Sequence, residues 1–335
     1  MRQLDRHRGV KAMRKLSIQR ALNEALHEEM ERDSTVFVMG EDVGVYGGHL
    51  EVTAGLYNKF GPMRAIDTPI SEAVIAGAAF GAAIGGMRPV AEIQHIDFIT
   101  LALDSVVNHA AVLRYAYGGQ IQVPLVIRTQ GGCYPLGAQH SKSLEAWLVH
   151  VPGLKVVMPS TAYDAKGLLK SAIRDPNPVI FIEHKLIYRS ACEVPEEEYL
   201  VPLGVADIKR EGNHVTVVAT SRMVHESIAA AEELDREGIS LEIVDPRTLM
   251  PMDLNKIQQS VRKTGRLVVV HEGWKTGGYG AEVVARVCEA GPNLLKAPPL
   301  RLGAADVPPP YSPPLEELSI PSKKSICEAI RAFLN

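Results

Sequence analysis

Short runs of β-branched and other apolar residues alternate with longer helical patterns along the whole chain. Continuous apolar strands that alternate with helices indicate parallel sheets covered by helices on both faces. In the first half the expected strands are Val36–Met39, Val90–Ile93, Pro124–Arg128, Lys155–Met158 and Val179–Ile182, and the expected helices are Ile18–Arg32, Ser71–Gly86, Phe98–Tyr117 and Ala162–Arg174.

The same alternation restarts after an acidic, proline-containing stretch from Glu193 to Pro202. The sequence therefore predicts two α/β domains in series, each with a sheet that contains parallel strands. The boundaries are an extension at 1–14, a first domain at 15–192, a linker at 193–205 and a second domain at 206–335. In the second domain the expected strands are Val215–Ala219, Leu241–Val244 and Leu267–Val270, and the expected helices are Arg222–Glu237, Leu254–Arg262, Gly280–Cys288 and Lys323–Leu334.

Bulk properties exclude several classes of protein. The 335 residues suffice for two domains with full cores, and the net charge of −3 without long basic runs argues against a nucleic-acid partner. No apolar run approaches the roughly 20 residues of a membrane helix. The four cysteines form no C-x-x-C pair, and the basic N-terminus has no apolar core typical of a secretory signal. We expect a reducing, cytoplasmic setting, without a membrane partner.

Glu72 is the first candidate functional residue. It follows the extended run Asp67-Thr68-Pro69-Ile70-Ser71 and opens a helix of small and apolar residues that carries glycines mostly at four-residue spacing. One reading is ordinary: acidic side chains are favoured in first helical turns by the helix dipole. The other is that a carboxylate among apolar neighbours lies in a desolvated interface and shares a proton with a ligand nitrogen.

Two further candidates also follow strands, where ligands bind in open α/β sheets. His140 closes the glycine-rich segment Gly131–Ser141 that comes after one strand, although a histidine is more often structural than catalytic. Gln94, His95 and Phe98 leave another strand. Phe98 could stack on a planar ligand ring or could be a core aromatic residue.

Familiar nucleotide motifs are missing from the sequence. There is no G-x-x-x-x-G-K-[ST] loop and no G-x-G-x-x-G after the first strand, and no Gly-Asp-Gly is followed by an Asn at the distance that holds a Mg²⁺–diphosphate. If Glu72 binds a cofactor, another element must hold the phosphates of that cofactor.

Several ordered stretches, each weak alone, together resemble one family. The chain is similar to the beta subunit of the thiamine-diphosphate-dependent 2-oxoacid dehydrogenase component, found in pyruvate, branched-chain and acetoin dehydrogenase complexes. The resemblance runs from Leu16 to the C-terminus. The stretches are Gly40–Val43, Asp67–Glu72, Gly86–Pro89, Gln139–Ser141, Pro152–Val157, Asp164–Leu168, Ser171–Asp175 and Asp245–Leu249.

The resemblance implies a transketolase-like arrangement, with a pyrimidine-binding domain followed by a transketolase C-terminal domain. Thiamine diphosphate would lie between this subunit and an alpha subunit that holds Mg²⁺ and the diphosphate, in an α₂β₂ heterotetramer. The implied reaction is decarboxylation of a small 2-oxo acid, with pyruvate favoured. It is followed by reductive acylation of the lipoyl group of an acyltransferase core.

Residue roles are implied by the same resemblance. Glu72 matches the carboxylate that hydrogen-bonds the aminopyrimidine ring, and His140 matches the histidine that faces the substrate. Phe98 matches the aromatic residue that stacks on the pyrimidine, with Ile70 and Gln94 in the same pocket. Glu41 and Asp104 match acids of a proposed proton tunnel between two active sites, and Leu101 replaces a further acid of that tunnel.

A potassium site is also implied by the resemblance, held largely by backbone carbonyl groups, although an ordinary helix C-terminus would look the same in sequence. His95 departs from the family pattern, in which an aromatic residue is common. The residues at the implied potassium site are Leu125, Ala172, Ile173, Asp175 and Asn177.

Three alternatives remain open at this stage. An acetoin dehydrogenase beta subunit would share the fold, cofactor and motifs. A non-catalytic assembly subunit would bind a partner that performs all the chemistry. A NAD-binding oxidoreductase domain would fit the alternating pattern, although the missing glycine fingerprint counts against it.

Overall fold

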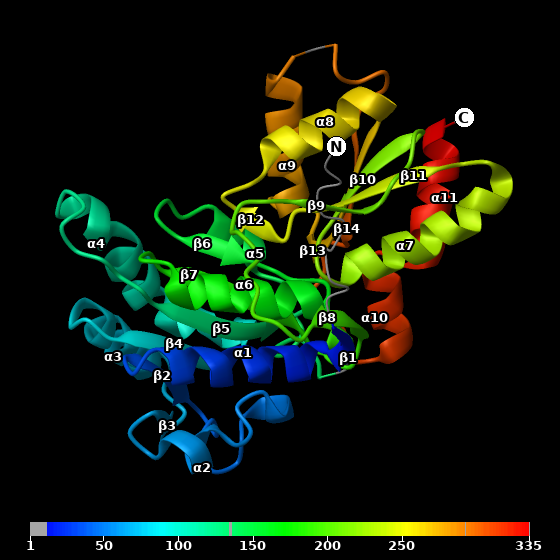
Figure 1. The fold of residues 1–335 in the computed structure, drawn as a ribbon. Coiled ribbons are helices and arrows are strands. Elements are labelled where there is room, and N and C mark those ends of the chain that lie inside the picture. Colours follow the sequence, from blue (N-terminus) through cyan, green and yellow to red (C-terminus); the bar gives the residue numbers. More distant parts are fainter. Residues whose placement is uncertain (1–11, 134–135, 292, 335) are drawn as a thin grey trace, which may run out of the picture.

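The computed structural model describes residues 12–133, 136–291 and 293–334. The fold contains two large sheets, each flanked by helices. The first sheet is built mainly from the N-terminal half of the chain and the second from the C-terminal half (Figure 1). Most of the N-terminal extension predicted at 1–14 lies outside the described residues. The predicted fold class, two α/β domains in series with parallel-containing sheets, is confirmed.

The first sheet has seven strands in the order β12-β6-β7-β5-β4-β2-β3, and all neighbours are parallel except β12 and β6. Its strands are β2 (Val36–Gly40), β3 (Ala65–Asp67), β4 (Arg88–His95), β5 (Val126–Gly131), β6 (Lys155–Val157), β7 (Val179–His184) and β12 (Thr248–Met250). Alternate residues of one strand enter two different cores, because successive side chains point to opposite faces.

Helices cover both faces of this sheet. Helices α1 (Ile18–Arg32) and α6 (Ala162–Arg174) pack beside each other on one face, as Figure 1 shows. The other face is covered by α3 (Glu72–Ile84), α4 (Ala111–Ala116), α5 (Glu145–Val149), the 3-10 turn Ile96–Ala102 and the π-helical segment Asp104–Ala110. Smaller elements are α2 (Leu56–Phe60) and the 3-10 turns His49–Glu51 and Lys185–Ile187.

The second sheet has five strands in the order β14-β13-β10-β11-β9, parallel except for β9. One face packs on α7 (Arg222–Leu234) and α11 (Lys323–Leu334), and the other on α8 (Leu254–Thr264) and α9 (Tyr279–Glu289). The strands are β9 (Asp207–Arg210), β10 (Val215–Ala219), β11 (Leu241–Asp245), β13 (Leu267–Trp274) and β14 (Leu300–Ala304), and the remaining helices are α10 (Pro313–Ser319) and the 3-10 turn Asp235–Glu237.

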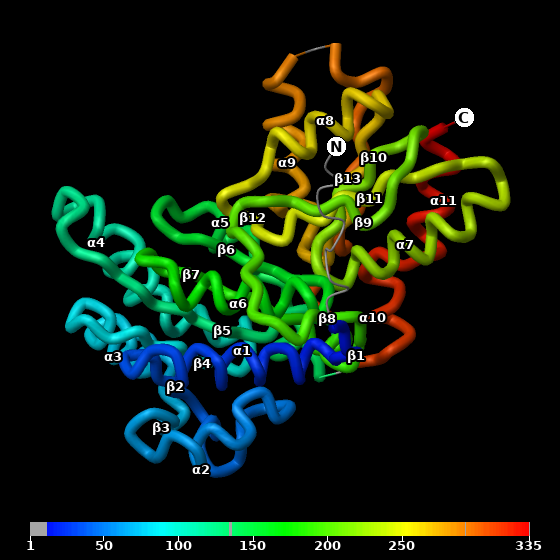
Figure 2. Tube along the Cα trace, viewed as in Figure 1, coloured from blue at the N-terminus to red at the C-terminus, as the bar shows by residue number. Residues whose placement is uncertain are grey.

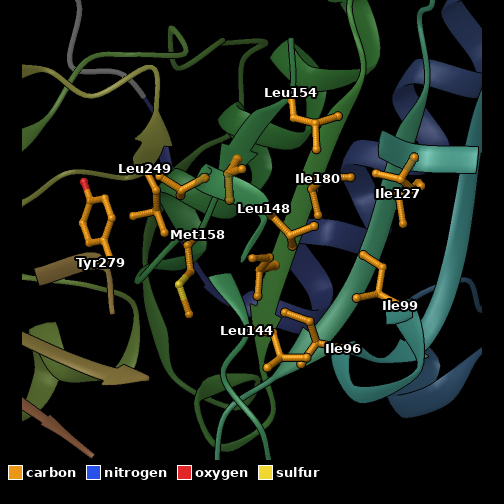
Figure 3. Packing of buried hydrophobic residues seen from close by; sticks show 14 of the residues in the cluster. Ile96, Ile99, Ile127, Leu144, Leu148, Leu154, Met158, Ile180, Leu249 and Tyr279 are labelled. Carbon is orange, nitrogen blue, oxygen red and sulfur yellow. The ribbon is translucent and has the colours of Figure 1, made fainter. Parts of the chain in front are cut away.

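A small antiparallel sheet in the N-terminal half pairs β1 (Met13–Ser17) with β8 (Ala191–Pro195), so the first residues of the predicted linker lie in a strand. The two halves are joined by more than the connecting chain. Strand β12, from the C-terminal half, pairs with β6 at the edge of the first sheet. One continuous apolar core therefore extends from Tyr279 and Leu249 through Met158 and Leu148 to Ile127 (Figure 3).

The helix expected at Phe98–Tyr117 is not continuous. The segment passes from a 3-10 turn through a π-helical stretch before it becomes α-helical at Ala111. Within the described residues no single helix is long and apolar enough to cross a membrane. One bent pair, Ile96–Ala102 with Asp104–Ala116 at an angle of 57°, meets the requirement on length and composition alone.

Candidate active site

The candidate residues are brought together because they follow neighbouring parallel strands. Carboxyl ends of parallel strands lie at one edge of a sheet, and the strands β5, β4, β2 and β3 are consecutive in the order of the first sheet. The loops that leave them carry His140, Phe98, Glu41 and Glu72, respectively. The tube in Figure 2 follows these connections between the strands and the helices.

These side chains line one cavity of about 440 Å³. Glu72, the first residue of α3, is half-buried, and Ile70 at the rim is 73% exposed. Gly40 precedes Glu41 and could not be replaced by a residue with a side chain, because a Cβ atom there would lie 2.7 Å from the carbonyl oxygen of Glu92. The lining residues are Glu41, Ile70, Glu72, Ile75, Glu92, Ile93, Gln94, His95, Phe98, Leu101 and His140.

Aromatic and imidazole rings form one wall of the cavity. The ring of His140 lies edge-on to His95, with centroids 4.9 Å apart, and edge-on to Phe98 at 5.3 Å. His49 adds a further ring 5.8 Å from His95. Burial lowers the pKa of His95 to about 4, and the positive charge of Lys185 acts in the same direction, so His95 is neutral at neutral pH.

Carboxylates also line the cavity. Burial raises the pKa of Glu41, and the nearby charges of Asp42 and Glu72 raise it further. Glu92 is 1% exposed, and burial raises its pKa although Arg128 opposes the shift. One oxygen of Glu92, Oε1, has no hydrogen-bond partner, so the lining of the cavity contains an unsatisfied polar atom.

A buried ion cluster holds the Glu92 carboxylate. The guanidinium of Arg128 donates to Glu92 Oε2 at 2.6 Å and to both oxygens of Glu183, at 2.7 and 2.8 Å. Tyr188 donates its hydroxyl to the same Glu183 carboxylate. Arg128 is 1% exposed, so its planar group is matched by acceptors where water does not reach it.

The cavity fits the ring half of a planar heteroaromatic cofactor. It combines an aromatic face from Phe98, an amide from Gln94 and a carboxylate from Glu72, which are groups that bind a ring carrying amino and ring nitrogens. Among the described residues that line it, none is Lys or Arg. A diphosphate attached to such a ring would therefore need cationic ligands from elsewhere.

A second, larger cavity of about 990 Å³ lies between α5, β6 and α9. Its walls include Trp147, Met250 and Tyr279, and none of the acids or rings described above faces it. We therefore select the candidate active site by its converging polar groups and not by volume.

The residues expected at a potassium site lie at the C-terminal end of α6 and before β5. The carbonyl of Ile173 accepts a hydrogen bond from Arg88 Nη1 at 2.9 Å, and the carbonyl of Asp175 accepts from the same atom at 3.4 Å. Each carbonyl oxygen retains a second lone pair for a cation. No cluster of three or more His, Cys, Asp or Glu side chains suited to a metal ion occurs in the part of the chain that the structure describes.

Asp104 lies apart from the cavity. It is exposed on the π-helical segment, where its carboxylate accepts from Asn108 at 2.8 Å. Tyr134 and Pro135, within the glycine-rich segment before His140, lie outside the described residues. The sequence analysis missed Lys185, which is 7% exposed and whose Nζ lies 2.5 Å from the His140 carbonyl oxygen. The signal available was a charged run, Glu183-His184-Lys185, at the end of a strand.

Two protein families match successive parts of the chain. Residues 14–190 match the transketolase pyrimidine-binding domain, and residues 204–326 match the transketolase C-terminal domain. Among solved structures, the chain is similar to a split-gene transketolase described as an inactive β4 tetramer. That match has a TM-score of 0.77, 24% identity and coverage of 95% of this chain and 98% of that one, which supports the fold.

Closer relatives carry a more specific name. The chain is 46% identical over 315 residues to the pyruvate dehydrogenase E1 component subunit beta of Gracilaria tenuistipitata var. liui, covering 94% of this chain and 98% of that protein. The mitochondrial subunit of Rattus norvegicus is 47% identical over 336 residues, and that of Homo sapiens 46%, each covering 98% of this chain and 93% of the relative.

Proposed function

Because this chain belongs to the family of pyruvate dehydrogenase E1 component beta subunits, we propose that it is the beta half of a 2-oxo acid dehydrogenase. With an alpha subunit it would bind thiamine diphosphate, decarboxylate pyruvate and pass the acyl group to the lipoyl group of an acyltransferase core. The observation that carries the proposal is the cavity in which Glu72, Gln94, Phe98 and His140 converge.

The proposed roles follow from the chemistry of each side chain. When bound, the cofactor supplies an electron sink for the decarboxylation. The Glu72 carboxylate would exchange a proton with a nitrogen of the aminopyrimidine, and Phe98 would present an aromatic surface to that ring. Ile70 and Gln94 would line the ring's edge beside Glu41, whose pKa is raised by burial and by the nearby charges of Asp42 and Glu72.

His140 would face the substrate within the same cavity. Its ring contacts both Phe98 and His95, so its imidazole is placed beside the surface on which the cofactor ring would stack. An imidazole there can donate a proton to, or accept one from, an oxygen of the reacting acid or of the lipoyl group.

Two features of this chain support a partner alpha subunit: the cavity lacks cationic side chains among its described lining residues, and apolar side chains near it are exposed. The cavity has no Lys or Arg among its described lining residues, so cations and Mg²⁺ for the diphosphate would come from the partner. The apolar side chains of Ile70 and Leu101, which line the cavity, are 73% and 59% exposed, and that of Val74 on α3 is 60% exposed. On α3, a Cβ atom at Gly81 would meet nothing within 4 Å, which leaves room for another backbone.

We also propose that the protein binds a potassium ion, assembles as an α₂β₂ heterotetramer and is cytoplasmic. A cation at the end of α6 would use carbonyl oxygens of Ile173 and Asp175 together with those of Leu125, Ala172 and Asn177. The named relatives include mitochondrial subunits, so the compartment is a separate question from the chemistry.

An acetoin dehydrogenase beta subunit is the alternative with the same fold and cofactor. A non-catalytic assembly subunit is the alternative of a different class. It predicts that side chains in the cavity can be replaced without loss of turnover.

The test measures reduction of an artificial electron acceptor, coupled to decarboxylation of a 2-oxo acid or to cleavage of acetoin. The chain is assayed alone and with its alpha partner, with and without thiamine diphosphate and Mg²⁺, on pyruvate, branched-chain 2-oxo acids and acetoin. We expect activity only in the mixture, only with cofactor, and highest on pyruvate. No activity from a verified, stably associated complex would contradict the proposal, and preference for acetoin would favour the alternative.

A further inference from the structure

The segment that carries His140 is held by a buried ammonium group. Lys185 follows β7 and is only 7% exposed. Its Nζ donates to the carbonyl oxygen of His140 at 2.5 Å and lies 3.4 Å from the carbonyl oxygen of Gly132. We call residues 131–142 the His140 loop, of which 134 and 135 are outside the described part. Lys185 thus contacts the backbone of the loop at two places, near its start at Gly132 and at His140.

Other contacts fasten the same loop at its ends. Lys142 donates to Asp97 Oδ1 at 2.9 Å, and the amide of Gly132 donates to the Lys142 carbonyl at 3.0 Å. From the second domain, Glu272 accepts from the amide of Cys133 at 2.6 Å. The loop ends are therefore fixed without Lys185, whereas Lys185 contacts the backbone of His140 itself.

The charges around Lys185 come from several elements. Asp97 is the second residue of the 3-10 turn after β4, Glu272 lies on β13 and Glu316 on α10, and all three carboxyl groups favour the charged ammonium. On the cavity side, the positive charge of Lys185 lowers the pKa of His49 and of His95. The ammonium is thus close enough to act on the rings that line the cavity.

We infer that Lys185 is a positioning residue for His140, whose backbone it holds so that the imidazole faces the cavity. A hydrogen bond from an ammonium to a carbonyl is charge-assisted and stronger than a neutral one. His140 meets the rings of both His95 and Phe98, so a displaced carbonyl would misalign its imidazole. The catalytic consequence rests on the proposed function, but the contact does not.

Burial lowers the pKa of Lys185 to about 8, against the opposing effect of Asp97 and Glu272. As pH rises through about 8 the group loses its charge, and its bond to the His140 carbonyl weakens. Activity should therefore fall on the alkaline side of the profile with this pKa.

Kinetics of the assembled alpha–beta complex test the inference. In Lys185→Met we expect kcat to fall about 10- to 100-fold at neutral pH, with little change in the KM for cofactor. Lys185→Arg keeps the charge, so we expect it to restore most of the activity and to move the alkaline limb to higher pH. The matched control is Lys166→Met, which removes another buried lysine, paired with Glu24 and Glu28. Wild-type kcat and an unchanged pH profile in Lys185→Met would overturn the inference.

A readout without turnover separates this inference from the proposed function. Amide hydrogen exchange is measured on peptides covering 136–142 in the same complex, after a melting curve shows that each variant is folded. We expect faster exchange of this segment in Lys185→Met and not in Lys166→Met. In the wild type, exchange corrected for intrinsic chemistry should rise above pH 8, and this arm needs no variant.

The outcomes are distinct. Unchanged exchange in Lys185→Met and across pH contradicts the inference whatever the activity. Faster exchange in a complex that decarboxylates no 2-oxo acid contradicts the proposed function and supports the role of Lys185.

Discussion

The imidazole of His140 lies edge-on to the phenyl ring of Phe98, with ring centroids 5.3 Å apart and an interplanar angle of 84°. The two residues leave neighbouring strands, β5 and β4, and meet at the wall of one cavity. Phe98 thus contacts the ring that we expect to face the substrate and offers a surface to the ring that we expect to be bound. We therefore expect cofactor binding and the placement of His140 to be linked through Phe98.

Replacing Phe98 should weaken cofactor binding while the protein remains folded. In Phe98→Ala we expect the thiamine diphosphate concentration at half-maximal activity to rise about 10-fold, because an aromatic pair contributes about 0.5–1.5 kcal/mol beyond its buried area. Phe60→Ala, at the end of α2, is the control. An unchanged cofactor requirement in Phe98→Ala would show that the ring does not stack on the cofactor.

Removing Arg128 should destabilise the first domain strongly. Arg128→Met leaves Glu92 and Glu183 buried without their cation, and we expect the free energy of unfolding to fall by about 3–5 kcal/mol. Chemical denaturation measures the change. As a control, Arg286→Met breaks a partly exposed pair with Glu282 and should cost no more than about 0.5 kcal/mol. Equal effects of the two substitutions would contradict the assignment of a buried cluster.

Glu145 should make stability depend on pH. It is 1% exposed at the start of α5, and burial raises its pKa to about 7, while backbone amides of Glu145 and Gly273 oppose the shift. Because the pKa of Glu145 is higher in the folded than in the unfolded state, its contribution to the free energy of unfolding is complete below about pH 4.5. This contribution is lost as the pH rises through about 7.

Glu145→Gln cannot ionise, so its stability relative to the wild type should increase between pH 5 and pH 8, by up to about 3 kcal/mol. Urea denaturation at a series of pH values gives this difference directly. A stability difference that stays constant with pH would mean that Glu145 titrates near its ordinary value.

Several elements could be predicted from local sequence because local interactions define them. Helices α1 and α6 begin and end where the sequence predicts, and the side chains of Ser17 and Thr161 cap their first turns. The continuous helix expected at Phe98–Tyr117 was wrong, because the π-helical stretch has no signature in apolar periodicity. Strand β12 was missed, since its pairing with β6 joins distant parts of the chain.

In the candidate site, too, some features could be predicted from the sequence and others could not. Glu72, Phe98 and His140 could be located because each follows a strand, and the order of the strands brings them into one cavity. The bond from Lys185 to the His140 carbonyl could not be predicted, because nothing local to either residue indicates that β7 ends beside the loop after β5. The catalytic roles of these residues remain predictions.

Potassium should stabilise the complex if the carbonyl groups at the end of α6 bind it. We expect the melting temperature to be about 2–4 °C higher in KCl than in NaCl or choline chloride at equal ionic strength, because a ligand that binds only the folded state raises its stability. Identical melting temperatures in the three salts would contradict a potassium site.

The central claim is that Glu72 promotes proton removal from the bound cofactor. The most direct measurement is the rate at which the C2 hydrogen of thiamine diphosphate exchanges with deuterium in the assembled complex. We predict that Glu72→Gln slows this exchange about 100- to 10,000-fold, the range typical of losing a positioned acid–base group. Glu31→Gln, an exposed acid on α1 paired with Lys59, should leave the rate unchanged. Exchange at the wild-type rate in a folded, cofactor-bound Glu72→Gln complex would contradict the account.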